Sequence, residues 1–113
     1  SDILIYRLVY NLVENAIKYN HLGGQVTVIA YQKEKHIYLS VEDTGSGIPE
    51  DFRERVFEPF FRVDKSRSRE LGGVGLGLAL VREIVRVHDG SITVRANPSG
   101  GTIFDVMFPQ GYI

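Results

Sequence analysis

The first segment of the chain repeats its apolar residues with the period of a helix. Over residues 3–19, most positions around the helix circumference are Ile, Leu, Val, Ala or Tyr. The polar residues fall within about 100° of arc on a helical projection. They are Arg7, Asn11, Glu14, Asn15 and Lys18. The pattern predicts a largely buried helix with one narrow polar stripe, which ends at the glycine-containing residues 20–24.

Two pairs of later segments alternate apolar and polar residues with the period of a β-strand. The segments are 25–31 and 37–42, joined by residues 32–35, and 91–96 and 102–108, joined by residues 97–101. The joining residues are polar or are rich in Asn, Pro, Ser and Gly. This combination predicts two β-hairpins.

The middle of the chain is less regular. Residues 43–48 break the second expected strand, and Pro49 opens a short helix. From residue 58 to residue 74 we find no periodicity, which predicts a long loop of the kind that is usually functional or disordered. Residues 75–88 return to a helical pattern.

The order of these elements predicts the fold class. It runs helix, two strands, short helix, loop, helix, two strands. We expect an α+β two-layer sandwich, with helices on one face of a mixed, largely antiparallel sheet. Neither a repeat nor a linker divides the sequence, so residues 1–113 are expected to form a single domain.

Composition narrows the function classes. With 113 residues, 43% hydrophobic and 24% charged, the chain is typical of a globular domain. The absence of cysteine excludes disulfides, thiolate metal sites and a cysteine nucleophile. A net charge of -1 argues against generic binding to nucleic acid or to a membrane surface. The longest apolar runs are far shorter than the roughly 18 residues of a membrane span.

The polar stripe of the first helix carries two asparagines one turn apart, Asn11 and Asn15, with Lys18 on the same arc. A buried asparagine costs free energy unless its amide is hydrogen-bonded, so neighbouring loops could satisfy either residue. Alternatively, amide oxygens at this spacing can hold a hard cation such as Mg²⁺ while Lys18 contacts phosphate. The shared stripe favours this second interpretation.

Two glycine-rich segments offer further candidate chemistry. Residues 43–48 place the Asp43 carboxylate at a strand end, where it can accept a hydrogen bond from a ligand amine, although such residues are also common in turns. Residues 72–78 place Gly75 and Gly77 at a helix start, where free N–H groups attract phosphate. Close helix packing is the alternative there, and the spacing matches neither a Rossmann nor a Walker motif.

Residues 57–62, Phe-Glu-Pro-Phe-Phe-Arg, carry three aromatic side chains beside the irregular segment. They could form a plain packing cluster, and the charges of residues 62–70 could belong to a solvated loop. The functional alternative is a lid over about residues 58–74, anchored by the aromatic rings, whose cations reach phosphate. The three histidines form no pair with metal-ligand spacing, so we expect them to be structural.

In this order, the four motifs resemble the conserved boxes of sensor histidine kinases. Residues 11–19 resemble the asparagine box and residues 43–48 the first glycine box. Residues 57–62 resemble the phenylalanine box and residues 73–78 the second glycine box. The resemblance covers essentially the whole chain. It implies the ATP-binding catalytic domain of a two-component histidine kinase, in the ATPase superfamily that also contains gyrase, MutL and a heat-shock chaperone.

The resemblance also implies roles for individual residues. It makes Asn15 the Mg²⁺ ligand, and it makes Asn11, Lys18 and Arg62 the catalytic residues that support or contact the phosphates. Asp43 is expected to accept a hydrogen bond from the adenine amino group. The other residues expected to bind ATP are Tyr19, Gly45, Gly47, Ile48, Phe60, Gly73, Val74, Gly75, Leu76 and Gly77. Val74 stands where Thr or Ser is frequent, so we expect one hydroxyl contact to be lost.

The implied partners lie outside this sequence. Nothing in it resembles a phosphoacceptor-histidine motif, so the γ-phosphate is expected to go to a histidine on a separate dimerisation domain, and from there to a response regulator. Family members usually have a strand before Asp2. We therefore expect a fragment of a longer chain, monomeric by itself and the cytoplasmic part of a membrane-anchored sensor.

Three alternative functions are weighed against this one. Hydrolytic ATPases of the gyrase or MutL kind place a glutamate where Asn11 stands, and asparagine cannot act as a general base. An anti-sigma-type serine kinase shares the boxes, but residues 57–62 fit it less well. A nucleotide-binding interaction module without turnover stays open, because Asn15 and Asp43 indicate binding of ATP without demonstrating transfer.

Overall fold

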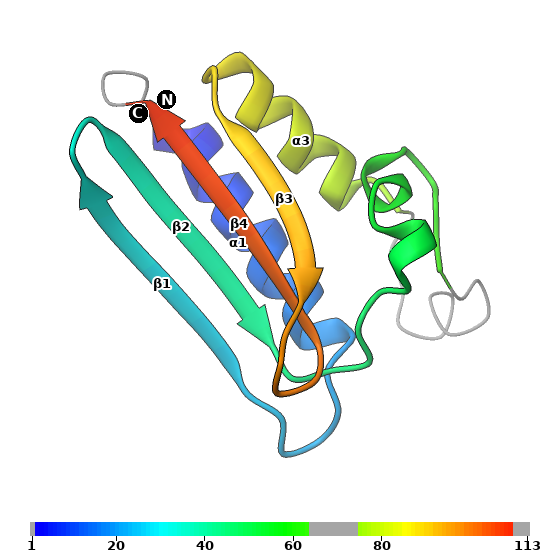
Figure 1. The fold of residues 1–113 in the computed structure, drawn as a ribbon. Coiled ribbons are helices and arrows are strands. Elements are labelled where there is room, and N and C mark those ends of the chain that lie inside the picture. Colours follow the sequence, from blue (N-terminus) through cyan, green and yellow to red (C-terminus); the bar gives the residue numbers. More distant parts are fainter. Residues whose placement is uncertain (1, 64–74, 110–113) are drawn as a thin grey trace.

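The computed structural model describes residues 2–63 and 75–109 (Figure 1). Its elements are α1 (Asp2–Lys18), β1 (Val26–Lys33), β2 (His36–Asp43), the 3-10 helices η1 (Glu50–Phe52) and η2 (Arg55–Phe57), α3 (Gly77–Val87), β3 (Ser91–Ala96) and β4 (Thr102–Pro109). The predicted order is confirmed, except that two 3-10 turns replace the short helix. Most of the expected lid lies outside the described residues. No helix among those described has the length and apolar character needed to cross a membrane.

The four strands form one sheet in the order β1-β2-β4-β3. Every ladder between the described strands is antiparallel. The sheet was expected to be mixed and largely antiparallel, and over these strands it is entirely antiparallel. The helices α1 and α3 cover one face of this sheet (Figure 1), so the predicted α+β sandwich is confirmed. The last strand in sequence, β4, lies inside the sheet and pairs with both β2 and β3.

The core lies between the two helices and the central strands. On α1 the fully buried residues recur at intervals of four, at Leu8, Leu12 and Ala16. On the sheet, the register places Val41 of β2 opposite Phe104 of β4, and both are about 1% exposed. Burial of each large apolar side chain contributes roughly 1.5–3 kcal/mol, so this shared cluster holds α1 against α3 and the sheet.

The expectation that α1 is buried around most of its circumference is wrong. Ile3, Tyr6, Tyr10 and Ile17 are between 54% and 70% exposed. A sandwich of only two layers has a sheet on one side of each helix, so the opposite side of α1 has nothing described to pack against. Apolar composition therefore overstated the burial of this helix.

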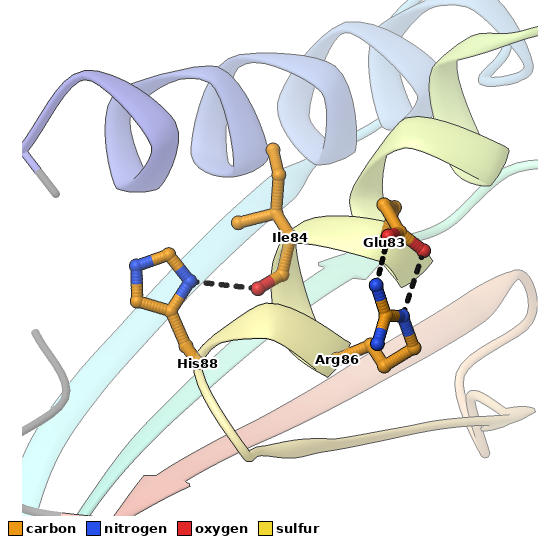
Figure 2. A network of polar contacts seen from close by, with 4 residues as sticks. All are labelled: Glu83, Ile84, Arg86 and His88. Carbon is orange, nitrogen blue, oxygen red and sulfur yellow. Dashed lines mark hydrogen bonds and ion pairs between the residues drawn. The ribbon is translucent and has the colours of Figure 1, made fainter.

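The C-terminal end of α3 is closed by His88, which is 5% exposed. The carbonyl of Ile84 accepts a hydrogen bond from Nδ1 of His88 at 2.7 Å (Figure 2). Phe108 packs edge-on against the His88 ring. Arg86 and Glu83 pair with each other on the exposed side of the same helix. His88 thus joins α3 to β4, as expected for a structural histidine.

Candidate functional site

A cavity of about 250 Å³ lies where α1, the segment after β2, the start of α3 and the start of β4 meet. From α1 it is lined by Asn11, Asn15 and Lys18, with Tyr19 directly after the helix. Because these residues share one helix stripe, the helix directs them all toward the same space. The structure therefore brings together the candidates that the first motif provided.

The start of α3 contacts Asn11 directly. The side-chain amide of Asn11 donates to the carbonyl of Arg7 at 2.7 Å, which leaves Oδ1 facing α3. A Cβ atom at Gly77 would lie 2.9 Å from that Oδ1. Glycine at this position therefore lets the N-terminus of α3 approach the asparagine stripe, where backbone N–H groups attract anions. Gly75 and Leu76 also line the cavity.

Lys18 is paired with a residue that the sequence analysis placed on the stripe but not in the site. Its Nζ lies 3.3 Å from Oε1 of Glu14, one turn earlier, and Glu14 lines the same cavity. Glu14 also accepts a hydrogen bond from Tyr10. That bond, and then the one from Lys18, hold the pKa of Glu14 below its usual value, and the Tyr10–Glu14 bond raises the pKa of Tyr10.

Asp43 lies at the end of β2 and is 4% exposed. Its Oδ1 accepts hydrogen bonds from the backbone N–H groups of Gly45, at 2.9 Å, and Thr102, at 3.2 Å. Among the described residues Oδ2 has no hydrogen-bond partner, so it is the oxygen left for a ligand. Burial raises the pKa of Asp43, and the two backbone bonds partly offset this effect.

The turn before β4 completes the surroundings of Asp43, and the sequence analysis missed it. The side chain of Asn97 donates to the Asp43 carbonyl at 2.9 Å, and Thr102 lines the cavity. At Gly101, φ is +97° and a Cβ atom would lie 2.2 Å from that same carbonyl oxygen. The signal in the sequence was the pair of glycines before Thr102, which we interpreted only as part of a hairpin turn.

Replacement of Gly101 by alanine is expected to destabilise the protein more than the same change at Gly100. Both glycines have a φ near +95°, but a Cβ at Gly100 meets no atom within 4 Å. Gly100→Ala should therefore cost only the backbone strain, about 1–2 kcal/mol. Gly101→Ala should cost a further ~1–3 kcal/mol because the Asp43 backbone must move. Urea unfolding of both variants measures the difference, and equal losses would contradict the contact.

Removal of the Asp43 charge should stabilise the ligand-free protein by an amount that grows as pH rises. Because burial raises the folded-state pKa of Asp43, the folded protein retains a proton that the unfolded chain has released near the ordinary pKa of about 3.9. Stability from this group is therefore present at low pH and is lost as pH rises through the raised pKa. The unfolding free energy of Asp43→Asn, relative to the parent, should increase from about pH 4 to pH 7. A difference that stays constant or falls in urea titrations would contradict this.

The phenylalanine segment differs from its expected arrangement. Phe57, at 4% exposure, packs edge-on against Phe104 of β4, and Phe61 packs against Phe52. Phe61 lines the cavity, whereas Phe60 does not and is 67% exposed. The reason is local: Phe60 has a φ of 67°, and its N–H donates to the carbonyl of Gly75 at 2.8 Å.

The remaining candidates divide into three groups. Arg62, Gly47 and Ile48 line the cavity. Gly45 does not, because it packs against the end of α1, where a Cβ atom would lie 2.2 Å from the carbonyl of Tyr19. Gly73 and Val74 lie outside the described residues. The lining residues that sequence analysis missed are Glu14, Ser46, Val56, Phe61, Val63, Leu78 and Thr102.

The oxygen donors at the asparagine stripe suit a hard cation only together with a ligand. No group of three or more His, Cys, Asp or Glu among residues 2–63 and 75–109 is arranged to hold a metal ion. Asn11 and Asn15 offer neutral amide oxygens, which Mg²⁺ accepts when phosphate and water oxygens complete its shell. The residues present therefore fit a metal that arrives with a phosphate ligand.

Residues 1–112 match a protein family described as "Histidine kinase-, DNA gyrase B-, and HSP90-like ATPase". The chain is 44% identical over 109 residues to the sensor histidine kinase RppB of Synechocystis sp.. It is 42% identical over 107 residues to the sensor histidine kinase WalK of Bacillus subtilis. These alignments cover 96% and 93% of this chain but only 24% and 18% of those proteins. The chain thus spans about a quarter or less of the length of these relatives.

Comparison with solved structures also finds histidine kinases. The mycobacterial sensor histidine kinase MprB superposes with a TM-score of 0.85 at 36% identity, over 96% of this chain and 72% of that one. The catalytic domain of the histidine kinase ThkA superposes with a TM-score of 0.81 at 29% identity, over 96% of this chain and 67% of that one. Fold and sequence therefore agree across nearly the whole chain.

Proposed function

Because the chain belongs to the histidine kinase-, DNA gyrase B- and HSP90-like ATPase family, we propose that it is the ATP-binding catalytic domain of a sensor histidine kinase. In this role it binds Mg-ATP and donates the γ-phosphate to a histidine on a separate domain. The observation that carries the proposal is the shared cavity. A buried acceptor, Asp43, lies in the same space as the stripe of Asn11, Asn15 and Lys18.

The Asp43 end of the cavity supports recognition of adenine. Backbone N–H groups hold Oδ1 of Asp43, so Oδ2 is oriented to accept from an exocyclic amine. Ile48, Val56 and Leu78 add apolar surface to the walls, as a flat heteroaromatic ring requires. Guanine carries a carbonyl where adenine carries the amine, so this acceptor selects adenine.

The asparagine stripe of α1, Arg62 and the start of α3 support binding of the triphosphate. Lys18 and Arg62 provide cations, and the start of α3 provides backbone N–H groups. Asn15, supported by Asn11, would hold Mg²⁺, which when bound neutralises phosphate charge. These residues bind and orient the phosphates, and Arg62 adds positive charge where charge develops during transfer.

The proposal extends to partners and location. We propose that residues 1–113 act as one nucleotide-binding domain, with a lid over about residues 58–74, that is monomeric by itself. The phosphate acceptor is the dimerisation domain of the same kinase, and a response regulator receives the phosphate afterwards. Such a kinase works in the cytoplasm as part of a membrane-anchored sensor. The curated relatives are several times longer than this chain, which is consistent with an acceptor domain in the same kinase.

Two measurements test the proposal. Calorimetry should show binding of Mg-ATP at modest affinity and little binding of Mg-GTP. Labelled ATP should then transfer phosphate to the purified phosphoacceptor domain when this chain is added in trans. Absence of both heat and thermal shift at millimolar Mg-ATP would contradict nucleotide binding. Binding without transfer would instead favour an interaction module without turnover.

A further inference from the structure

Two side chains of the cavity have the same sign of charge as the proposed ligand, and only one of them has a role in binding it. The described lining contains two carboxylates, Asp43 and Glu14. Asp43 has a role as the adenine acceptor, whereas Glu14 shares the stripe of Asn15 and Lys18. A carboxylate beside a polyphosphate is unfavourable, since like charges repel. Its presence at this position therefore calls for an explanation.

The contacts of Glu14 provide one. Its carboxylate lies 3.3 Å from the Lys18 ammonium, one helical turn toward the C-terminus. It also accepts a hydrogen bond from Tyr10, one turn toward the N-terminus. The Glu14 and Lys18 side chains are 40% and 30% exposed. Ion pairs in contact with water are weak, so a more highly charged anion can replace Glu14 as the partner of Lys18.

We propose that Glu14 is an exchangeable counter-charge for Lys18: it pairs with Lys18 in the empty site and gives Lys18 up to phosphate when the nucleotide binds. The inference rests on the proposed function. Tyr10 is the positioning residue, because its hydroxyl holds the Glu14 carboxylate toward the outer surface of α1 after Lys18 has left. Glu14 thereby lowers the affinity for phosphate-bearing ligands and favours release of the product ADP.

The effect must depend on the charge of the ligand. Replacement of Glu14 by glutamine removes both the competitor for Lys18 and the repulsion of phosphate. We expect Glu14→Gln to bind ADP on the order of 3- to 10-fold more tightly at low salt, with a smaller gain at high salt. Binding of adenosine, which has no phosphate, should not change. A merely structural role for Glu14 would alter both ligands equally.

The experiment is calorimetry with adenosine, ADP and ATP, with and without Mg²⁺, at two salt concentrations. Glu83→Gln is the matched control, because Glu83 is an exposed carboxylate that pairs with an arginine on α3 and does not line the cavity. It should leave all affinities unchanged. Tyr10→Phe should weaken ADP binding, and this loss should disappear when Glu14→Gln is also present.

The outcomes separate this inference from the proposed function. If the parent binds ADP and Glu14→Gln binds it equally well, the counter-charge role is overturned while nucleotide binding stands. If Glu14→Gln weakens binding only when Mg²⁺ is present, Glu14 is a metal ligand and the inference is again overturned. If the parent binds neither adenosine nor ADP, the proposed function falls, and the inference falls with it.

Discussion

Asp43→Asn is expected to lose the preference for ATP over GTP and to weaken ATP binding by about 10- to 100-fold. The geometry specifies how. The backbone N–H groups of Gly45 and Thr102 both donate to Oδ1, so the asparagine oxygen will occupy that position. Its NH₂ group then stands where Oδ2 stood, and a donor faces the adenine amine. The variant exchanges a charge-assisted hydrogen bond for two opposed donors.

Dissociation constants of both nucleotides for the two proteins test this prediction. Unfolding of the same samples should show that the variant is folded. Because burial raises the pKa of Asp43, the charged carboxylate does not stabilise the fold at neutral pH, and its loss should not unfold the protein. A variant that retains the nucleotide preference of the parent would show that Asp43 does not contact the base.

Arg62→Ala is expected to bind nucleotide nearly normally and to lose most of the phosphotransfer. Arg62 lines the cavity and follows Phe61, whose ring packs 5.6 Å from that of Phe52 and under the Arg55 guanidinium. This ring, and not that of Phe60, anchors the backbone before Arg62. A cation aimed at the γ-phosphoryl oxygens stabilises the transition state more than the ground state, so its loss lowers rate more than affinity. An arginine of comparable role is worth about 10³–10⁵ in rate, which is the upper bound here.

The assay compares transfer to the phosphoacceptor domain with nucleotide dissociation constants. Arg86→Ala removes the same charge from an exposed site on α3 and serves as the control. If Arg62→Ala transfers phosphate at the rate of the parent, Arg62 has no role in transfer. It is then a surface cation whose ion pairs contribute about 0–1 kcal/mol to stability.

Local periodicity was sufficient to find the elements but not to arrange them. The stripe on α1 and the alternation in β2 and β4 are visible in the sequence, because a helix and a strand each impose a fixed period. The pairing of β2 with β4 has no such local signal, since it joins segments about 60 residues apart. The strand order β1-β2-β4-β3 therefore became known only from the structure.

The same distinction explains which site residues were found. Asp43 and Asn15 belong to motifs that are each continuous in the sequence, whereas Thr102 enters the site only through the pairing of β4 beside β2. The choice between Phe60 and Phe61 depends on a single backbone angle, φ of 67° at Phe60. Sequence patterns do not specify an angle of that kind.

The position of β4 also determines when the site can exist during protein synthesis. The ribosome adds roughly 5–20 residues per second from the N-terminus, so Asp43 is made long before Gly101 and Thr102, which surround it. A nascent chain that ends before β4 has the asparagine stripe but an unshielded carboxylate. ATP can therefore stabilise only the completed fold, because a ligand stabilises the state that binds it. Nucleotide binding by chains arrested at successive lengths would report the moment at which the last strand enters the sheet.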